Sequence, residues 1–364
     1  MNALATYIHN LDPVLLAIPG TPLAVRWYGL AYVAGFILGY LVLLQLSKKK
    51  LYCVEADKLS DFITWVCILG VLMGGRLGEF FFYWLPEHGF SGLVDDPRWV
   101  FRVWEGGMAS HGGIIGVLLV AVWYARRNNL SLPAVTDGLA IVCTIGLFFG
   151  RVANFINGEL YGRICNASHA LAMKFPQELF SLPIEKQIQA RVAVDHALGA
   201  PIENFMLRSN TGAITEGYGD AILRLCREHP AAGEALGQFL TPRYPSQLFE
   251  AAGEGLILFA ILITLRLTWR NAPAGIFSAL FCFLYSAARI TCECFKEPDA
   301  NVWYGITQGQ ATPSSLLLWA LLSLSPPAKT TEKHLIRKKI KKLQKKACIV
   351  RQNRVNSRRT LLDK

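Results

Sequence analysis

The sequence predicts an all-α, multi-pass membrane protein with about seven transmembrane helices and a head segment outside the membrane. Hydrophobic residues make up 52% of the 364-residue chain and charged residues only 17%, whereas soluble domains carry roughly 25% charged residues. The apolar residues also gather into runs that approach the about 20 residues needed to cross a hydrocarbon core. A large soluble enzyme with buried helices is the alternative, and the repeated runs disfavour it.

Seven apolar runs mark the expected spans: 27–46, 62–82, 107–125, 133–150, 247–265, 274–294 and 308–325. The third run begins glycine-rich and the seventh contains Pro313, so these two are the weakest. The transmembrane body is expected over 1–328. It includes one long hydrophilic insertion, the head segment 164–242, and a basic tail follows at 329–364.

Basic clusters predict the orientation. The segments "SKKK" (47–50), "ARRN" (125–128), "RLTWRN" (266–271) and the tail follow the first, third, fifth and seventh spans. Cytoplasmic loops carry the excess of Lys and Arg, so these segments are expected inside. The N-terminus and the head segment then lie outside.

The net charge of +11 comes from the tail. Residues 329–364 hold fourteen Lys or Arg and two acids, which gives +12 and leaves −1 for the rest of the chain. The body therefore has no basic field for nucleic acid, and none is expected as a partner. The tail could contact RNA, but a lysine-rich juxtamembrane segment more often lies on anionic membrane lipids.

The nine cysteines show no metal-binding pattern, because Cys292 and Cys294 form CxC without a second pair. Neither a metal nor an organic cofactor is expected. Cys165 and Cys226 lie in the hydrophilic insertion, and their pairing as a disulfide stays open.

Charged and polar residues within the spans fall in the outer half of each span under this orientation, apart from Asp137: Arg76, Glu79, His111, Glu250, Glu254, Arg289 and Glu293. Charges at membrane depth are costly and usually face a cavity or a partner. One polar chamber near the outer leaflet is therefore expected. The alternative is a set of interfacial side chains that snorkel to water.

The stretch "FFGRVANFINGELYGR" (148–163) leaves the fourth span with many polar groups. Arg151 and Asn154 share a helix face if the helix continues, and Glu159 and Arg163 have the spacing of a helical ion pair. Guanidinium groups bind phosphate oxygens in bidentate fashion, and lipid head groups are the phosphates available at this depth.

Two other stretches carry candidate groups. His111 lies among five glycines in "EGGMASHGGIIGV" (105–117), where glycine allows close approach of backbone or ligand and the imidazole could act as a base; a lone histidine is more often structural. Glu250 and Glu254 are one turn apart in the fifth span. Both can be ionised in hydrocarbon only if a cation such as Arg151, Arg243 or Arg289 lies near.

At these residues the chain resembles the prolipoprotein diacylglyceryl transferase family. The matching motifs occur in the family's order: "VRWYGL" (25–30), "GGRLGE" (74–79), "WEGGMASHGGIIG" (104–116), "GRVANFINGELYGR" (150–163), "RYPSQLFEA" (243–251), "FKEPDA" (295–300) and "ITQGQ" (306–310). Ala153 stands where the family's signature usually has glycine, and 164–242 matches poorly.

The resemblance implies a bacterial inner (plasma) membrane enzyme with a periplasmic head segment, an N-terminus outside and a cytoplasmic C-terminus. It would transfer the sn-1,2-diacylglyceryl group of phosphatidylglycerol to the lipobox cysteine of a preprolipoprotein signal peptide. A thioether forms and glycerol phosphate leaves, the first step of lipoprotein maturation.

The resemblance also implies roles for individual residues. Three residues would be catalytic, with His111 as base or binder and two arginines on the phosphate: His111, Arg151 and Arg243. The substrate-binding residues would be Tyr28, Arg151, Asn154, Glu159, Gly162 and Glu250.

Two other classes of protein stay open. A transporter or flippase could use the same cations to bind an anionic solute, although transporters tend to show repeat symmetry and no matching halves are visible here. A non-catalytic lipid-binding scaffold is the third possibility.

Overall fold

The computed structural model describes residues 6–17, 24–89, 107–208, 214 and 216–297, and it is mostly helical. Five helices are long and apolar enough to cross a membrane by length and composition: Trp27–Lys48, Leu59–Gly89, Leu132–Asn157, Ser246–Thr268 and Ile276–Glu293. A sixth helix, α5 (Ser110–Arg127), is 18 residues long, the same length as Ile276–Glu293. These six match the first six predicted spans, which confirms a multi-pass helical protein. The seventh span and the basic tail lie outside the described residues.

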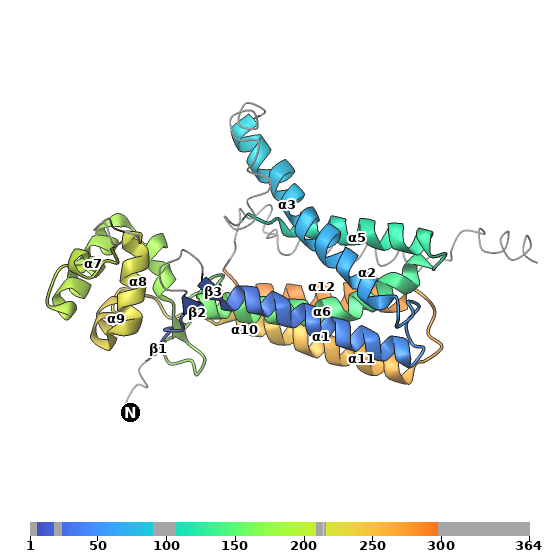
Figure 1. Ribbon diagram of the computed structural model, residues 1–364. Coiled ribbons are helices and arrows are strands. Elements are labelled where there is room, and N and C mark those ends of the chain that lie inside the picture. Colours follow the sequence, from blue (N-terminus) through green and yellow to red (C-terminus); the bar gives the residue numbers. More distant parts are fainter. Residues whose placement is uncertain (1–5, 18–23, 90–106, 209–213, 215, 298–364) are drawn as a thin grey trace, which may run out of the picture.

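Four of these helices lie side by side as a bundle (Figure 1). They are α1 (Trp27–Lys48), α6 (Leu132–Asn157), α12 (Ile276–Glu293) and a helix that runs through α10 (Ser246–Glu250), η7 (Ala251–Ile257) and α11 (Leu258–Thr268). The other three all pack on α6, which is the central element. Their shared core includes Leu43, Ile141, Leu262 and Phe277, each at most 1% exposed.

The remaining two spanning helices form a tight pair. One consists of α2 (Leu59–Trp65), η1 (Val66–Met73), α3 (Gly74–Glu79) and η2 (Phe80–Trp84), and the other is α5. A Cβ on Gly112 would lie 2.3 Å from the Gly74 carbonyl oxygen and 2.6 Å from the Gly78 Cα. Small residues let transmembrane backbones approach this closely. Gly112 and Gly116 near His111 therefore serve helix packing.

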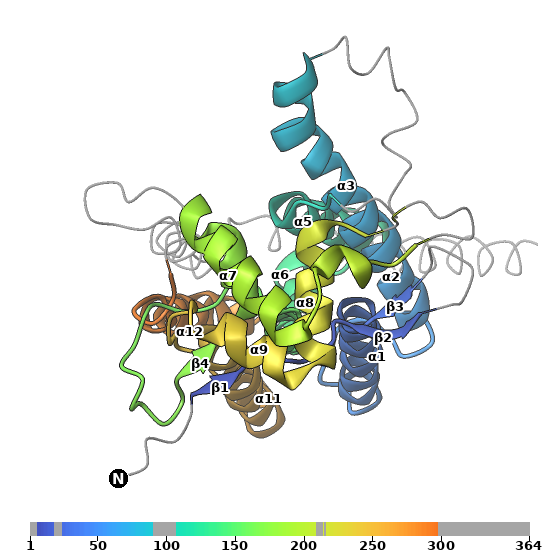
Figure 2. The ribbon, with the colours of Figure 1, turned by 90° about the vertical axis from the view of Figure 1, so that its left-hand side faces the viewer.

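The head segment has its own hydrophobic core. It contains η5 (Pro176–Ser181), α7 (Ile184–Leu198), η6 (Ile202–Asn204), α8 (Tyr218–Glu228) and α9 (Pro230–Gly237), and it lies beyond one end of the bundle (Figures 1 and 2). Val194, Ile202, Leu225 and Leu236 are at most 1% exposed. Cys165 and Cys226 are both free thiols, so they do not form a disulfide.

Two small sheets depart from the all-α prediction. β1 (Tyr7–Ile8) pairs in parallel with β4 (Met173–Lys174), and β2 (Val14–Ala17) pairs antiparallel with β3 (Ala24–Arg26). Strands this short have no alternating pattern that could be recognised in a sequence. The first sheet attaches the N-terminal residues to the head segment.

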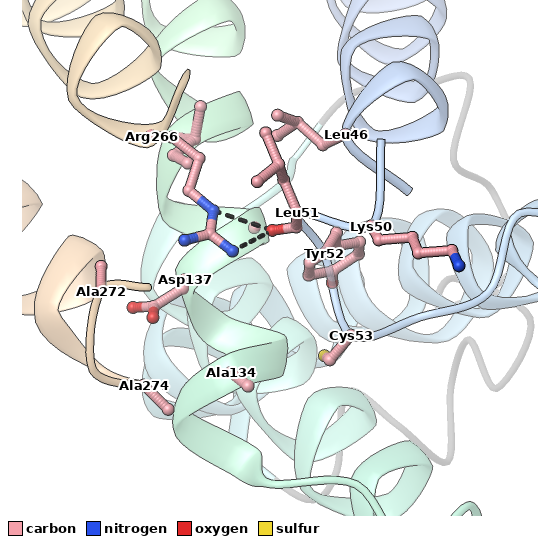
Figure 3. Close-up of a pocket in the computed structure, with 12 residues that line it drawn as sticks. Leu46, Lys50, Leu51, Tyr52, Cys53, Ala134, Asp137, Arg266, Ala272 and Ala274 are labelled. Carbon is pink, nitrogen blue, oxygen red and sulfur yellow. Dashed lines mark hydrogen bonds between the residues drawn. The ribbon is translucent and has the colours of Figure 1, made fainter. Parts of the chain in front are cut away.

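Asp137 has a structural role at the end of the bundle away from the head. Its carboxylate accepts hydrogen bonds from the backbone N–H groups of Gly275 (2.7 Å) and Ser278 (2.8 Å), and so satisfies donors that the N-terminus of α12 leaves unpaired. Nearby, Arg266 Nε donates to the Leu51 carbonyl oxygen at 2.8 Å. Both residues line a cavity of about 230 Å³ (Figure 3).

Candidate functional site

Two arginines and three glutamates from three spanning helices form one ion-pair network at the head end of the bundle. Arg151 comes from α6, where its Nη1 lies 2.9 Å from Glu250 Oε2 and its Nη2 lies 3.4 Å from Glu254 Oε2. Glu250 ends α10 and Glu254 lies one turn later in η7. Glu250 and Glu254, on consecutive turns of one helix, thus bind the two Nη atoms of the Arg151 guanidinium.

Arg289 of α12 binds the same two carboxylates. Its Nη1 lies 2.7 Å from Glu250 Oε1 and 3.2 Å from Glu254 Oε1. Its Nη2 lies 3.2 Å from Glu293 Oε2, one turn along the same helix. The cations that allow both glutamates to be ionised are therefore Arg151 and Arg289, two of the three that the sequence left open.

The network is buried, so these side chains do not snorkel to water. Glu250 and Glu254 are 0% exposed and Glu293 is 2% exposed. Two arginines and three glutamates give a formal charge of +2 − 3 = −1. Buried charges persist only when they are paired, and the five arginine–carboxylate ion pairs provide this pairing. The Arg151 side chain is 16% exposed and the Arg289 side chain 10%.

Three of the predicted substrate-binding residues lie around Arg151. Asn154 follows one turn later on α6 and is 7% exposed. In the orientation that satisfies its neighbours, its amide donates to Glu159 Oε1 at 3.3 Å. The charges of Glu159 and Arg151 both act on the Tyr28 hydroxyl from α1. These polar groups extend the network toward the head.

The predicted ion pair between Glu159 and Arg163 is wrong, because the helix does not continue. α6 ends at Asn157, and Gly158 adopts the left-handed conformation with φ of 69°. The helical i, i+4 spacing then no longer applies. Arg163 instead donates from Nε to the Lys296 carbonyl oxygen at 2.9 Å.

Arg243 belongs to a different network. Its Nη2 and Nε lie 2.8 and 3.0 Å from Glu178 Oε1, and its Nη1 lies 3.0 Å from Glu297 Oε2. Burial opposes the Arg243 charge, but the hydrogen bonds and charge of Glu178 outweigh it and raise the arginine pKa above its usual value. Among the described contacts Arg243 and Arg151 share no partner, so their convergence on one head group stays a prediction.

Gly162 is required by the backbone. A Cβ at this position would lie 2.5 Å from the carbonyl oxygens of both Tyr244 and Phe295. The Gly162 N–H donates to the Tyr244 carbonyl at 2.9 Å. Its side-chain-free Cα thus allows three chain segments to cross beside the network, which is a reason for glycine independent of any ligand.

His111 lies in the first turn of α5 and is exposed. No described residue forms a hydrogen bond with its ring. Its neighbour Gly112 is buried against α3, which leaves the imidazole on the outer side of the helix pair. Its role as a base or a binder stays a prediction.

Arg289, Glu254 and Glu293 complete the site, although the resemblance assigned them no role. Their signal in the sequence was spacing, because a charged pair at i, i+4 interrupts an apolar helix in both cases. Such pairs share one helix face, so two of them on neighbouring helices can meet.

Known proteins match nearly the whole body of the chain. The sequence profile of the family described as prolipoprotein diacylglyceryl transferase matches residues 13–325. A protein of Bdellovibrio bacteriovorus is 39% identical over 318 residues, which cover 83% of this chain and 89% of the relative.

Two further relatives come from Neisseria gonorrhoeae, 35% identical with 83% and 90% of the two chains covered, and from Bradyrhizobium diazoefficiens, 33% identical with 84% and 89% covered. All three relatives carry the name phosphatidylglycerol–prolipoprotein diacylglyceryl transferase. The five charged residues of the network lie within the matched region. The chain belongs to the prolipoprotein diacylglyceryl transferase family.

Proposed function

We propose that this protein transfers the diacylglyceryl group of phosphatidylglycerol to the cysteine thiol in the lipobox of a preprolipoprotein. The relatives' shared name supports the lipid, the prolipoprotein and the diacylglyceryl group, and the lipobox cysteine is part of the proposal. The observation that carries the proposal is a pair of arginines, Arg151 and Arg289, held by the same two buried carboxylates at one end of a membrane bundle.

The two arginines bind the lipid phosphate between them. When the bond between the glycerol carbon and the phosphate oxygen breaks, negative charge grows on the departing glycerol phosphate. Positioned cations stabilise such charge most strongly in a site that excludes water. Glu250 and Glu254 fix each guanidinium plane, and the five N–H donors of an arginine leave several free for the phosphate.

Neighbouring residues bind the rest of the head group. Asn154 and Tyr28 offer hydrogen-bond donors beside Arg151, and Glu159 accepts from the glycerol hydroxyls. Gly162 keeps the crossing segments close behind them. This places a polar pocket for the glycerol on the head side of the phosphate.

The thiol supplies the other half of the reaction. The cysteine sulfur forms a bond to the glycerol carbon while the bond from that carbon to the phosphate oxygen breaks, and the phosphate takes the electron pair. Thiolate is the attacking form, so the thiol proton must leave. His111 is the base that we propose for it.

The head segment 164–242 is proposed to lie in the periplasm and the tail 329–364 against the inner leaflet of a bacterial inner membrane. Two features support this orientation. The basic segments 47–50 and 266–271 span the ends of α1 and α11 away from the head, and basic loops favour the cytoplasm. The charged network then opens toward the outer leaflet.

A transfer assay tests the function. The purified protein is mixed with phosphatidylglycerol labelled in its acyl chains and with a lipobox peptide that contains either cysteine or serine. The cysteine peptide should gain the diacylglyceryl group as a thioether, and the serine peptide should gain none. A lipid transporter or a non-catalytic scaffold would modify neither peptide.

A further inference from the structure

Three chain segments that continue the helices of the charged network cross at one point beside the head. The Gly162 N–H donates to the Tyr244 carbonyl at 2.9 Å and the Arg163 N–H donates to the Phe295 carbonyl at 2.8 Å. The Tyr244 N–H donates in turn to the Arg163 carbonyl oxygen at 3.1 Å. Gly162 and Arg163 follow α6, Tyr244 precedes α10, and Phe295 follows α12. Their crossing therefore links the three helices that carry Arg151, Glu250 and Arg289.

The Arg243 guanidinium joins all of these segments to the head. It donates to the Gly162 carbonyl oxygen at 3.1 Å and lies 3.0 Å from Glu297 Oε2, beyond α12. Its remaining donors go to Glu178 in the head, and its plane lies 4.8 Å from the centre of the Tyr161 ring. The Arg243 side chain thus contacts three separate stretches of the chain, at Tyr161–Gly162, Glu178 and Glu297.

Glu178 holds Arg243 firmly in this place. The carboxylate is 2% exposed and also accepts the Thr241 N–H at 2.9 Å and the Thr241 hydroxyl. The arginine thus has a buried, fully hydrogen-bonded counter-ion of its own. A guanidinium with Nε and both Nη atoms directed at protein acceptors is suited to fixing geometry and has little capacity left for a lipid phosphate.

We propose that Arg243 is a positioning residue, which acts on the reaction by fixing the ends of α6, α10 and α12 relative to one another. This inference rests on the proposed transferase function. Arg151 and Arg289 share their carboxylates only if the three helices keep their register, and Arg243 is the side chain that ties all three. Its contribution to transfer therefore passes through the network, without contact to substrate.

Glu178→Gln separates this role from direct phosphate binding. If Arg243 positions the helices, loss of its main counter-ion loosens the crossing and kcat falls. If Arg243 binds phosphate, the same change frees its donors, and the lipid should bind more tightly with no fall in kcat. The two roles thus predict opposite results for a residue that has no substrate contact in either case.

Arg243→Gln and Arg243→Lys complete the series. We expect kcat to fall about 100-fold in Arg243→Gln, which is the cost of misplacing reacting groups by ~1 Å, while KM for phosphatidylglycerol changes less than about twofold. Lysine restores the positive charge but not the planar, bidentate guanidinium. The kcat of Arg243→Lys should therefore lie between the values of Arg243→Gln and the wild type. A large rise in KM with kcat unchanged would overturn the positioning role.

Arg224→Gln is the matched control. Arg224 also forms a close ion pair in the head, with its Nη2 2.7 Å from Glu216 Oε1, but it does not contact the crossing segments in the described structure. Its loss should weaken the head and leave kcat near the wild-type value. An equal fall in kcat would show that any head ion pair has this effect, and the proposal would be wrong.

Hydrogen exchange gives a readout that does not depend on transfer. The Gly162 and Arg163 amides should exchange faster in Arg243→Gln than in the wild type or in Arg224→Gln. If the wild-type protein modifies no peptide, the proposed function fails while this result can still hold. If transfer occurs but exchange and kcat do not change in Arg243→Gln, the positioning role fails on its own.

Discussion

Arg151→Lys probes the two-point geometry of the network. Arg151 holds Glu250 with one Nη atom at 2.9 Å and Glu254 with the other at 3.4 Å. Lysine has a single nitrogen, so it cannot reproduce this planar fork toward the carboxylates and the phosphate together. Loss of one preorganised donor to a developing oxyanion costs about 10²–10³ in kcat, or ~2.7–4 kcal/mol. We expect a fall of this size in the lysine variant.

The assay is diacylglyceryl transfer from labelled phosphatidylglycerol to a lipobox peptide. Arg151→Ala should be no more active than Arg151→Lys, because the alanine variant also leaves two buried carboxylates with one cation. Arg266→Lys is the matched control, since Arg266 also lies in a spanning helix but donates to the Leu51 carbonyl at the far end. Activity of Arg151→Lys within about threefold of wild type would refute the reasoning.

Three other predictions follow from the packing, from a buried histidine and from the absence of metal motifs in the sequence. Gly112→Ala should destabilise the protein by about 1–3 kcal/mol through overpacking, measured by thermal melting in detergent. Gly113→Ala should be tolerated, because a Cβ at Gly113 would lie 3.9 Å from the nearest atom. Equal melting temperatures of the two variants would contradict this prediction. His9 is 2% exposed, and burial lowers its pKa from 6.5 to about 4. As the pH falls, the imidazole is therefore protonated in the unfolded chain before it is protonated in the folded protein. The free energy of unfolding then falls between about pH 6.5 and 4, by about 3 kcal/mol at ~1.36 kcal/mol per pH unit. His9→Phe should flatten this part of the stability profile, and an unchanged profile would be evidence against the assignment. Chelators should leave transfer unchanged, and loss of activity that magnesium restores would show a metal requirement.

The spans could be predicted because hydrocarbon sets a length and a composition that the sequence must meet. Six runs coincide with helices, from α1 to α12. The two-residue and four-residue strands near the N-terminus could not be predicted in this way. β1 pairs with β4 of the head segment, which is distant in sequence, and β2 pairs with the equally short β3.

The charged residues of the site could be predicted as a group from the sequence, but the ion pairs that they form with one another could not. The sequence shows that Glu250 and Glu254 share a helix face and need a cation, and it offered three arginines. The choice of Arg289 over Arg243 follows from the packing of α12 against α10, a tertiary contact. Arg243 precedes α10 directly and is the nearest of the three in sequence, yet its ion pairs are with Glu178 and Glu297.

One local error has a physical cause. The ion pair expected between Glu159 and Arg163 assumed a continuous helix, but Gly158 ends α6 in the left-handed conformation, as glycine commonly does at helix C-termini. The glycines near His111 were compatible with a ligand crevice or with close backbone approach. The contacts of Gly112 with Gly74 and Gly78 show close backbone approach at that glycine, and a ligand crevice at His111 stays a prediction.

The position of the lipid phosphate tests the central claim most directly. A structure of the protein with bound phosphatidylglycerol should place phosphate oxygens about 2.7–3.2 Å from guanidinium nitrogens of both Arg151 and Arg289, with Arg243 still bound to Glu178. A phosphate bound to Arg243, or one that contacts neither Arg151 nor Arg289, would contradict the account.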